Sequence, residues 1–446
     1  MNCKRRFSKS YSATGAMHIL SVSGLHVGIV YAVIAFLLRF LDKKRRTKIF
    51  KAVIIILFLW IYAFITGLSP AVMRAAFMFS FVSLATCFER KSQIYNTIFA
   101  SAFLMLLIQP NSLFNIGFQL SYAAVLSIVF FQPGISKWIF PRNKIAKWTW
   151  DLVAVSVAAQ LGTAPFTLYY FHQFPNFFLL TNIIAIPLSS IIIYLAIALL
   201  LLSFVPLLST FIALLLKWSL WLMNSSIVFI QELPFSVSYL SLDYRQLIFS
   251  FVALFFVVFF FYNKKFSLLI VGLCSILVVT SIFFYQKYTN LRTAQFIVFS
   301  DSRVPIINFI FQEENYVFTT DSLHAEKIAD SFWKSKMLNN PTYLNKNQWF
   351  ESGFCCFYGK RIFILTDNTL KNKTTENPLP IDYLVITNKT KPKIEHILAC
   401  MQPKTVIVDK CISAWYTNHI KEVCRQNKTA FYIVAENGAF VLNLNP

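Results

Sequence analysis

Polar side chains inside apolar segments are the residues of this sequence that could do chemistry. Residues 18–29, H-I-L-S-V-S-G-L-H-V-G-I, place Ser23 and two histidines at the start of an apolar run. Polar groups there are costly in lipid unless they face protein or water. In one continuous helix His18 and His26 are about 12 Å apart, too far to share a metal ion. We therefore expect His26 to orient a neighbour by hydrogen bonding; helix packing alone would also explain the string.

A lone cation, Arg74, follows a turn marked by Gly67 and Pro70 in residues 66–76, T-G-L-S-P-A-V-M-R-A-A. A buried cation in a membrane segment is a candidate functional group. Snorkelling of the side chain to the interface explains it equally well.

Uncharged polar residues recur in two later strings. Gln119 and Ser121 lie in N-I-G-F-Q-L-S-Y-A-A-V-L, residues 115–126, and Gln160 lies in A-A-Q-L-G-T-A-P-F, residues 158–166. Such polar, interrupted helices form paths and binding sites in membrane proteins. The two strings therefore predict a polar path for a solute that is not bound by carboxylates. The second string is expected to interrupt its span, and Asn182 and Pro187 to break the next one. Expected helix contacts or breaks are Gly24, Gly28, Gly67, Pro70, Gly117, Gly162 and Pro165.

The elements that must position these residues follow from composition. The chain is 57% hydrophobic and 13% charged, about half the usual charged fraction of a soluble domain. Residues 1–291 hold 23 basic and 5 acidic residues, whereas residues 292–446 hold 18 and 14. This predicts a basic N-terminal segment (1–17), a polytopic α-helical membrane domain (18–290) and a soluble α/β domain (291–446). The apolar runs, each able to cross a hydrocarbon core of about 30 Å, are 18–40, 50–66, 71–88, 93–109, 114–132, 149–171, 177–204, 207–231, 246–262 and 266–286.

Loop charges predict the orientation. Basic clusters lie at 43–48, 90–91, 137–147 and 264–265, and ten spans place all four on one face. The positive-inside rule makes that face cytoplasmic, so the N-terminus and the C-terminal domain lie outside. The basic N-terminal segment alone favours the opposite orientation. The net charge of +22 is largely explained by this bias and does not by itself indicate DNA.

The last third predicts strands in 294–320 and alternating strands and helices in 361–444. A catalytic metal site needs clustered ligands, yet this region has three histidines, no H-x-H-x-D-H and no C-x-x-C pair. Asp321, Asp367 and Asp409 follow strands, where aspartate is more often a turn or helix cap than a catalytic group. We expect no metal, no cofactor and no catalytic residue.

The four membrane strings, in their order and spacing, resemble the competence domain of the ComEC family of inner-membrane channels for single-stranded DNA. The resemblance covers roughly residues 12–290 and implies uptake of one DNA strand during natural transformation, along a path lined by Ser23, His26, Arg74, Gln119, Ser121 and Gln160. Its implied partners are single-stranded DNA, membrane lipid, a DNA receptor, a motor ATPase and further copies of the chain in a homo-oligomer.

Two departures accompany this resemblance. Only a short segment precedes His18, so the chain resembles an N-terminally truncated member that lacks the family's extracytoplasmic OB-fold module. The tail is similar to the family's metallo-β-lactamase-like domain, but Asn388, Lys389 and Thr390 stand where the second histidine motif would follow its strand, so we expect a degenerate, non-catalytic relative. The alternatives are a transporter of another solute, an inactive fragment and, with less support, a membrane-anchored hydrolase.

Overall fold

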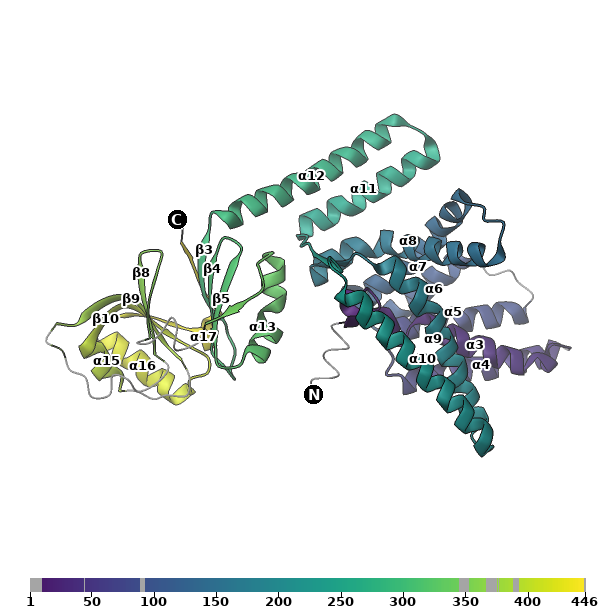
Figure 1. Cartoon of the computed structure of the whole chain (residues 1–446), viewed down its shortest axis with the longest axis horizontal. Helices are drawn as coiled ribbons and strands as arrows, with labels where there is room; N and C mark the ends of the chain where they lie inside the picture. Colours follow the sequence, from purple (N-terminus) through teal and green to yellow (C-terminus); the bar gives the residue numbers. More distant parts are fainter. Residues whose placement is uncertain are drawn as a thin grey trace. The chain divides into compact units, whose positions relative to one another are not determined.

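The chain divides into two compact units between Leu240 and Ser241. The computed structural model describes residues 10–43, 45–88, 93–344, 353–365, 375, 377–387 and 393–444 (Figure 1). Within these ranges, eight helices are long and apolar enough to cross a membrane, and two shorter apolar helices accompany them. The polytopic α-helical prediction is therefore confirmed, with a helix in each of the ten predicted segments.

The long helices share an apolar length of at least 18 residues. They are α4 (Arg45–Ile65), α5 (Pro70–Cys87), α7 (Ile116–Ile135), α8 (Lys144–Phe171), α9 (Phe178–Leu201), α10 (Pro206–Glu232), α11 (Tyr244–Asn263) and α12 (Phe266–Leu291). The shorter ones are α3 (Gly24–Leu37) and α6 (Ile94–Ile108). Their starts follow local sequence: Asn115 and Asn143 cap α7 and α8 through their side-chain oxygens, and proline occupies the first turn of α5 and α10.

Two sequence predictions about helix breaks were wrong. The segment 18–40 is not one helix, because a short α2 (Met17–Leu20) ends before α3 begins and residues 21–23 separate them. Conversely, α8 continues through Gln160 and Pro165, and α9 continues through Asn182 and Pro187. A proline removes one N–H donor, and a transmembrane helix tolerates that loss when its neighbours pack around it.

Short elements connect the membrane helices. Strands β1 (Gln173–Pro175) and β2 (Val237–Tyr239) pair antiparallel between the ends of α8 and α10. Three 3-10 turns, η1 (Arg39–Lys43), η2 (Pro110–Phe114) and η3 (Ser136–Trp138), lie next to α3, α6 and α7.

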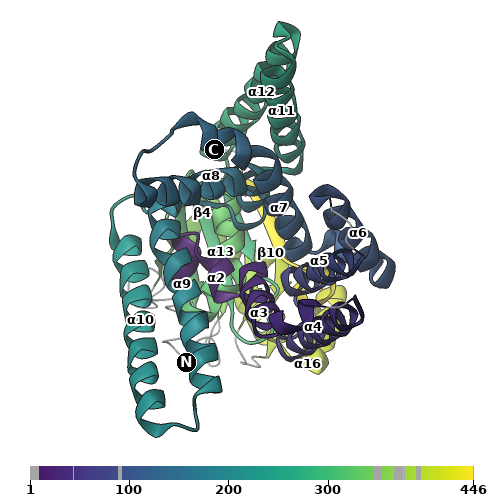
Figure 2. The same ribbon diagram turned by 90° about the vertical axis from the view of Figure 1, so that its right-hand side faces the viewer.

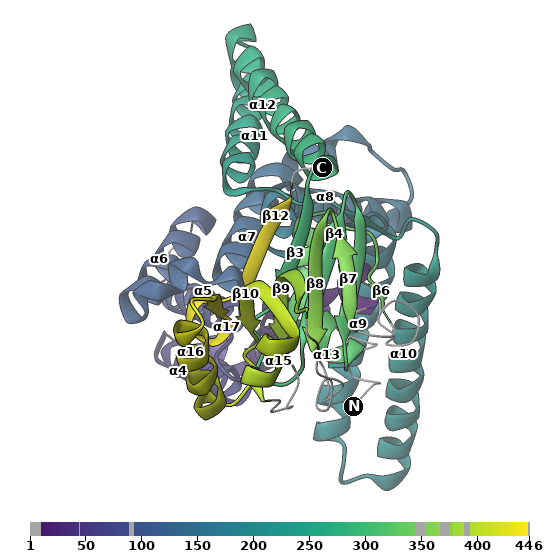
Figure 3. The ribbon, with the colours of Figure 1, turned by 90° about the vertical axis from the view of Figure 1, so that its left-hand side faces the viewer.

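The tail is a sandwich of two five-stranded sheets with helices on both outer faces (Figure 3). One sheet, ordered β12-β3-β4-β5-β6, carries α13 (Ser322–Ser335), and the other, ordered β11-β10-β9-β8-β7, carries α15 (Ile394–Cys400) and α16 (Ala414–Gln426). A short α17 (Val434–Asn437) precedes the last strand. The strands are β3 (Ala294–Val298), β4 (Ile306–Phe311), β5 (Glu314–Thr319), β6 (Thr342–Tyr343), β7 (Phe354–Phe357), β8 (Lys360–Leu365), β9 (Leu379–Ile386), β10 (Met401–Val408), β11 (Ala430–Ile433) and β12 (Phe440–Leu444).

Strand periodicity explains this layering. Successive side chains of a strand point to opposite faces, so a strand between a second sheet and a helix needs apolar residues on both. In β4, Ile306 packs with α13, and Ile307 and Phe309 pack in the core between the sheets. In β8, Ile364 lies in that core and Phe363 faces α15 and α16. The predicted mixed α/β tail is confirmed.

The boundary between the membrane domain and the tail differs between composition and compact units. The change of composition near residue 290 coincides with the end of α12 at Leu291, just before β3 begins. The division into compact units instead groups α11 and α12 with the tail. These two helices pack on each other, and the amide of Asn290 donates to the carbonyl of Lys336, while Lys287 pairs with Glu313 at 3.4 Å.

Candidate functional site

Arg74 lies in the second turn of α5 and is 7% exposed. Its Nη1 donates to the backbone oxygen of Ser121 at 2.6 Å, and its guanidinium carbon lies 5.8 Å from the centre of the Tyr122 ring, both in α7. Its buried Nε has no hydrogen-bond partner. This burial within the protein does not fit a side chain that snorkels to the interface. A charge-assisted bond and a cation–π contact therefore hold the guanidinium in place and leave donor capacity for a ligand.

The start of α3 lies against this guanidinium, and the start of α7 lies against the start of α5. A methyl group added at Gly24, the first residue of α3, would lie 3.1 Å from Nη2 of Arg74, and one added at Gly117 of α7 would lie 3.5 Å from Cγ of Pro70, the first residue of α5. None of the three first turns carries an acidic residue. Helix N-termini carry partial positive charge, and within the described ranges no carboxylate acts on Arg74. The site is therefore positive without a counter-charge.

Five helices close a ring that includes these three. In the described part of the chain, α3 packs on α5, α5 on α7, α7 on α8, α8 on α9, and α9 back on α3. Figure 2 shows these helices following one another around the N-terminal unit, with α10 beyond α9. We call α3, α5, α7, α8 and α9 the five-helix ring.

Unpartnered polar atoms concentrate on this ring. Among the described residues of the N-terminal unit, the buried side-chain atoms without a partner are Oγ of Ser69, Nε of Arg74, Oγ of Ser121 and Oδ1 of Asn182. Ser69 directly precedes α5 and its side chain makes no capping hydrogen bond, and the other three lie in α5, α7 and α9. Each such group costs about 1–3 kcal/mol when it stays unsatisfied, so their gathering on the ring helices is typical of an interior that takes water or a polar ligand.

The other predicted path residues differ in the hydrogen bonds that they form. Nδ1 of His26 accepts from the backbone N–H of Ser23 at 3.2 Å and lies 2.8 Å from its hydroxyl, so His26 orients the start of α3. The amide of Gln119 joins α7 to α8, because the Tyr170 hydroxyl donates to its Oε1 at 2.8 Å. Gln160 is half-buried in α8 and forms no hydrogen bond within the described ranges that links it to this cluster.

The predicted glycines divide into contacts and turns. Gly24 and Gly28 lie against Arg74 and Phe79 of α5, and Gly162 lies so close to α7 that an added methyl group would be 2.9 Å from a backbone oxygen. Gly67 has a φ of +82°, which favours glycine, at the turn before α5. Pro165, expected at a break, lies inside continuous α8.

Two side chains of the site carried no sequence signal strong enough to select them. Tyr122 and Tyr170 are ordinary aromatic residues of apolar helices, and the chain has 19 tyrosines. Tyr122 lies within the third polar string, and its hydroxyl lies 3.0 Å from that of Ser101 in α6. That buried polar contact joins α6 to the outside of the ring.

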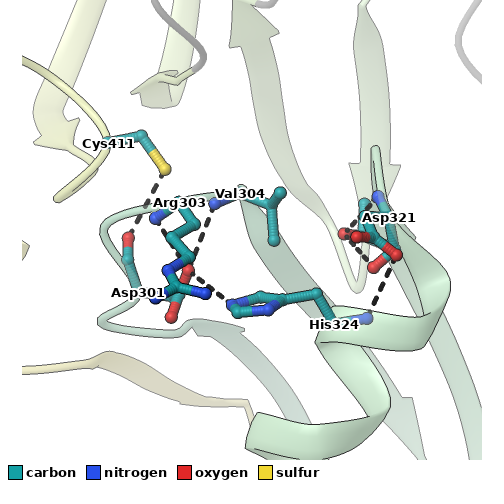
Figure 4. Close-up of polar contacts among 7 residues, drawn as sticks. Asp301, Arg303, Val304, Asp321, His324 and Cys411 are labelled. Atoms are coloured by element: carbon teal, nitrogen blue, oxygen red, sulfur yellow. Dashed lines mark hydrogen bonds and ion pairs between the residues drawn. The ribbon is translucent and has the colours of Figure 1, made fainter. Parts of the chain in front are cut away.

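The tail aspartates behave as caps and loop anchors. Oδ1 of Asp321 accepts from the backbone of His324 at 3.1 Å and caps α13 (Figure 4). Oδ1 of Asp301 accepts from the backbone of Arg303 and from the His324 ring, and Sγ of Cys411 donates to the Asp301 carbonyl (Figure 4). Burial opposes ionisation of the Asp301 carboxyl, but the backbone N–H groups of Arg303 and Val304 and the His324 ring outweigh it and lower the pKa. The contacts fasten the loop after β3 to the loop after β10.

Metal ligands do not gather in the part of the tail that the structure describes. Within the described ranges, no group of three or more His, Cys, Asp or Glu side chains could hold a metal ion. Asp409 is 1% exposed and its Oδ2 accepts from the Thr387 hydroxyl at 2.6 Å. Asp367 and residues 388–390 lie outside the described residues.

These features define a multi-pass membrane protein with a polar helical ring and an α/β domain after its spans. Residues 2–265 match the family described as Competence protein, and residues 296–444 match the ComEC C-terminal domain. The first match covers more than half of the 446 residues, so the chain belongs to the Competence protein family. The predicted resemblance is thereby confirmed.

Curated relatives match a smaller part of the chain. ComE operon protein 3 of Bacillus subtilis (strain 168) is 33% identical over 184 residues, which cover 41% of this chain and 22% of that protein. An uncharacterised protein of Aquifex aeolicus (strain VF5) is 28% identical over 41% of each chain, and Recombination protein 2 of Haemophilus influenzae is 24% identical over 41% of this chain and 24% of its own length. The matched region thus spans less than half of each relative. No solved structure matches the chain.

Proposed function

We propose that the five-helix ring conducts single-stranded DNA across the membrane during natural transformation. The observation that carries this proposal is the buried guanidinium of Arg74 on a helix of the ring: among the described residues no carboxylate neutralises it, and its Nε has no hydrogen-bond partner. Membership of a competence family supports DNA as the solute, and the closed circuit of contacts among the ring helices supports a route between them.

The chemistry of the ring suits a polyanion. Each nucleotide brings one phosphate charge, and guanidinium groups bind phosphate oxygens through paired donors. One buried cation on a ring that also carries neutral polar side chains, such as Ser121 and Asn182, attracts the backbone without holding it through many ion pairs. Such a lining stabilises successive phosphates equally, which lets a strand move past it.

The loop charges support an orientation for this route. If α3 and α6 both cross, the loops at 43–48, 90–91, 137–147 and 264–265 share the cytoplasmic face, and the tail lies outside the cytoplasmic (inner) membrane. If α6 did not cross, the loop at 90–91 would lie opposite the loop at 137–147. Residues 44, 90 and 91 lie outside the described residues and contribute here by their charge.

The tail is proposed to act without catalysis. The sequence Asn388, Lys389 and Thr390 after β9 supports this, because none of these side chains supplies the imidazole that a zinc site needs. A DNA receptor would then deliver the strand, a motor ATPase would draw it inward, and copies of the chain would act singly or as a homo-oligomer.

The experiment is complementation of a deletion strain, scored by transformation frequency and by labelled DNA that reaches the cytoplasm. Wild type should restore both, and Arg74→Ala should restore neither while reaching the membrane at the same level. Arg39→Ala, which removes an exposed arginine outside the ring, is the matched control and should behave as wild type. Import by Arg74→Ala at the wild-type level would contradict the role of the guanidinium. Unchanged transformation after deletion would favour a transporter of another solute or an inactive chain.

A further inference from the structure

We propose that the N-terminus of α3 and the Arg74 guanidinium together hold one phosphodiester group, and that Gly24 lets the helix start and the guanidinium approach closely enough to share it. This inference rests on the proposed function and names the part of the DNA that the ring recognises. The ligand is the singly charged backbone linkage and not the base.

The break before α3 creates the first half of this site. The helix begins at Gly24, and α3 is 14 residues long, so its first backbone N–H groups have no acceptor within the helix. His26 and Ser23 bond to each other and thereby fix the start of the helix without involving the N–H groups of Gly24 and Leu25. An anion at this position would accept from those donors and meet the positive end of the helix dipole.

Arg74 supplies the second half independently. The residue is 7% exposed, one of its nitrogens is bonded to the Ser121 carbonyl, and its Nε has no partner. Its Nη2 faces the start of α3, 3.1 Å from the point that a methyl group on Gly24 would occupy. A phosphodiester offers two unesterified oxygens, so one group can accept from the guanidinium and from the helix start at once. One guanidinium and one partial helix charge match a single negative charge.

Gly24 allows the start of α3 to lie this close to the guanidinium. A methyl group there would lie between the helix start and the guanidinium, also 3.7 Å from Cβ of Ala75. Gly28 is one turn further along the same helix face, and a methyl group there would lie 3.2 Å from Cζ of Phe79. The two glycines are thus similarly crowded, but only Gly24 borders a cation. Gly28→Ala is therefore the matched control for Gly24→Ala, because it measures the effect on binding of a crowded methyl group without a neighbouring cation.

The test measures binding without transport. The full chain in lipid nanodiscs is titrated with fluorescent tetrathymidylate and with the same tetranucleotide carrying uncharged methylphosphonate linkages. Wild type should bind the phosphodiester form and bind the methylphosphonate form at least about ten-fold more weakly, as expected for the loss of a charge-assisted hydrogen bond. Gly24→Ala should weaken phosphodiester binding by about the same factor, whereas Gly28→Ala should bind as wild type.

Equal binding by Gly24→Ala and wild type, or equal binding of the two tetranucleotides, would overturn the inference. If Gly24→Ala does not accumulate, Arg74→Lys replaces it: lysine keeps the charge but loses the planar fork, and retained wild-type affinity would likewise overturn the site. The two proposals fail separately. If DNA import is normal but Gly24→Ala binds the tetranucleotide like wild type, only this phosphodiester site is refuted. If the tetranucleotide binds as predicted but the complemented strain imports no DNA, only the transport function is refuted.

Discussion

Replacement of Gly162 by alanine tests the closest contact in the five-helix ring. The new methyl group would overlap Oγ of Ser127 in α7 and would lie 2.8 Å from its Cβ and 2.9 Å from the backbone oxygen of Ala123. The serine hydroxyl can rotate away, but the backbone oxygen cannot move without shifting α7. Overpacking of this kind costs about 1–3 kcal/mol, so Gly162→Ala should unfold several degrees below wild type.

The matched control is Gly134→Ala, because Gly134 lies near the end of α7 and has no atom within 4 Å of an added methyl group. That variant should unfold at or slightly above the wild-type temperature, since alanine favours a helix by up to about 1 kcal/mol. Thermal unfolding of the full chain in detergent, followed by tryptophan fluorescence, measures both. Ser127→Gly should restore part of the stability of Gly162→Ala. Equal unfolding temperatures for Gly162→Ala and Gly134→Ala would refute the close contact of α7 with α8 and, with it, the closed ring.

Two further predictions concern the tail. Burial raises the pKa of Asp409 to about 6 although Thr387 donates to it, so the folded tail binds this proton more tightly than the unfolded chain does. This proton binding stabilises the folded tail fully below about pH 4, and the free energy of unfolding falls by about 3 kcal/mol as the pH rises through about 6. Hydrogen exchange of the backbone amides of β9 and β10 measures this pH dependence, and Asp409→Asn should remove it. Trp333→Phe should destabilise the tail by about 1–3 kcal/mol, because it leaves Oδ1 of the fully buried Asn308 without its donor. Trp415→Phe, at a 72% exposed position, should leave unfolding by chemical denaturant unchanged.

The fold was largely accessible from the sequence because its signals are local. Apolar length predicted ten segments, each of which holds a helix, and short continuous apolar runs predicted β3, β8, β9 and β10. Helix interruptions were predicted less well. Pro165 and Pro187 indicate breaks in soluble proteins, but in α8 and α9 the surrounding helices keep the chain helical. The break after α2 was missed because Ser21, Ser23 and Gly24, which lie at it, were assigned to one continuous apolar span.

The sequence motifs that contain the site residues could be predicted, but the positions of these residues relative to one another could not. Gly24, Arg74 and Ser121 come from three separate strings, and only tertiary packing brings them together. Gln160 has the same polar character and stays outside their contacts, which sequence spacing cannot show. Tyr122 contributes through a ring face, a property that most buried tyrosines share, so no pattern distinguishes it.

The most direct test of the account is where DNA contacts the protein during transport. A photoreactive benzoylphenylalanine replaces Ser121 of the ring in one strain and Phe229, a 65% exposed residue of α10 outside the ring, in another. Cells are illuminated while they import labelled DNA, and crosslinked protein is isolated. The account predicts crosslinks to single-stranded DNA at position 121 and none above background at position 229. Equal crosslinking at both positions, or import that continues with no crosslink at position 121, would contradict a path through the five-helix ring.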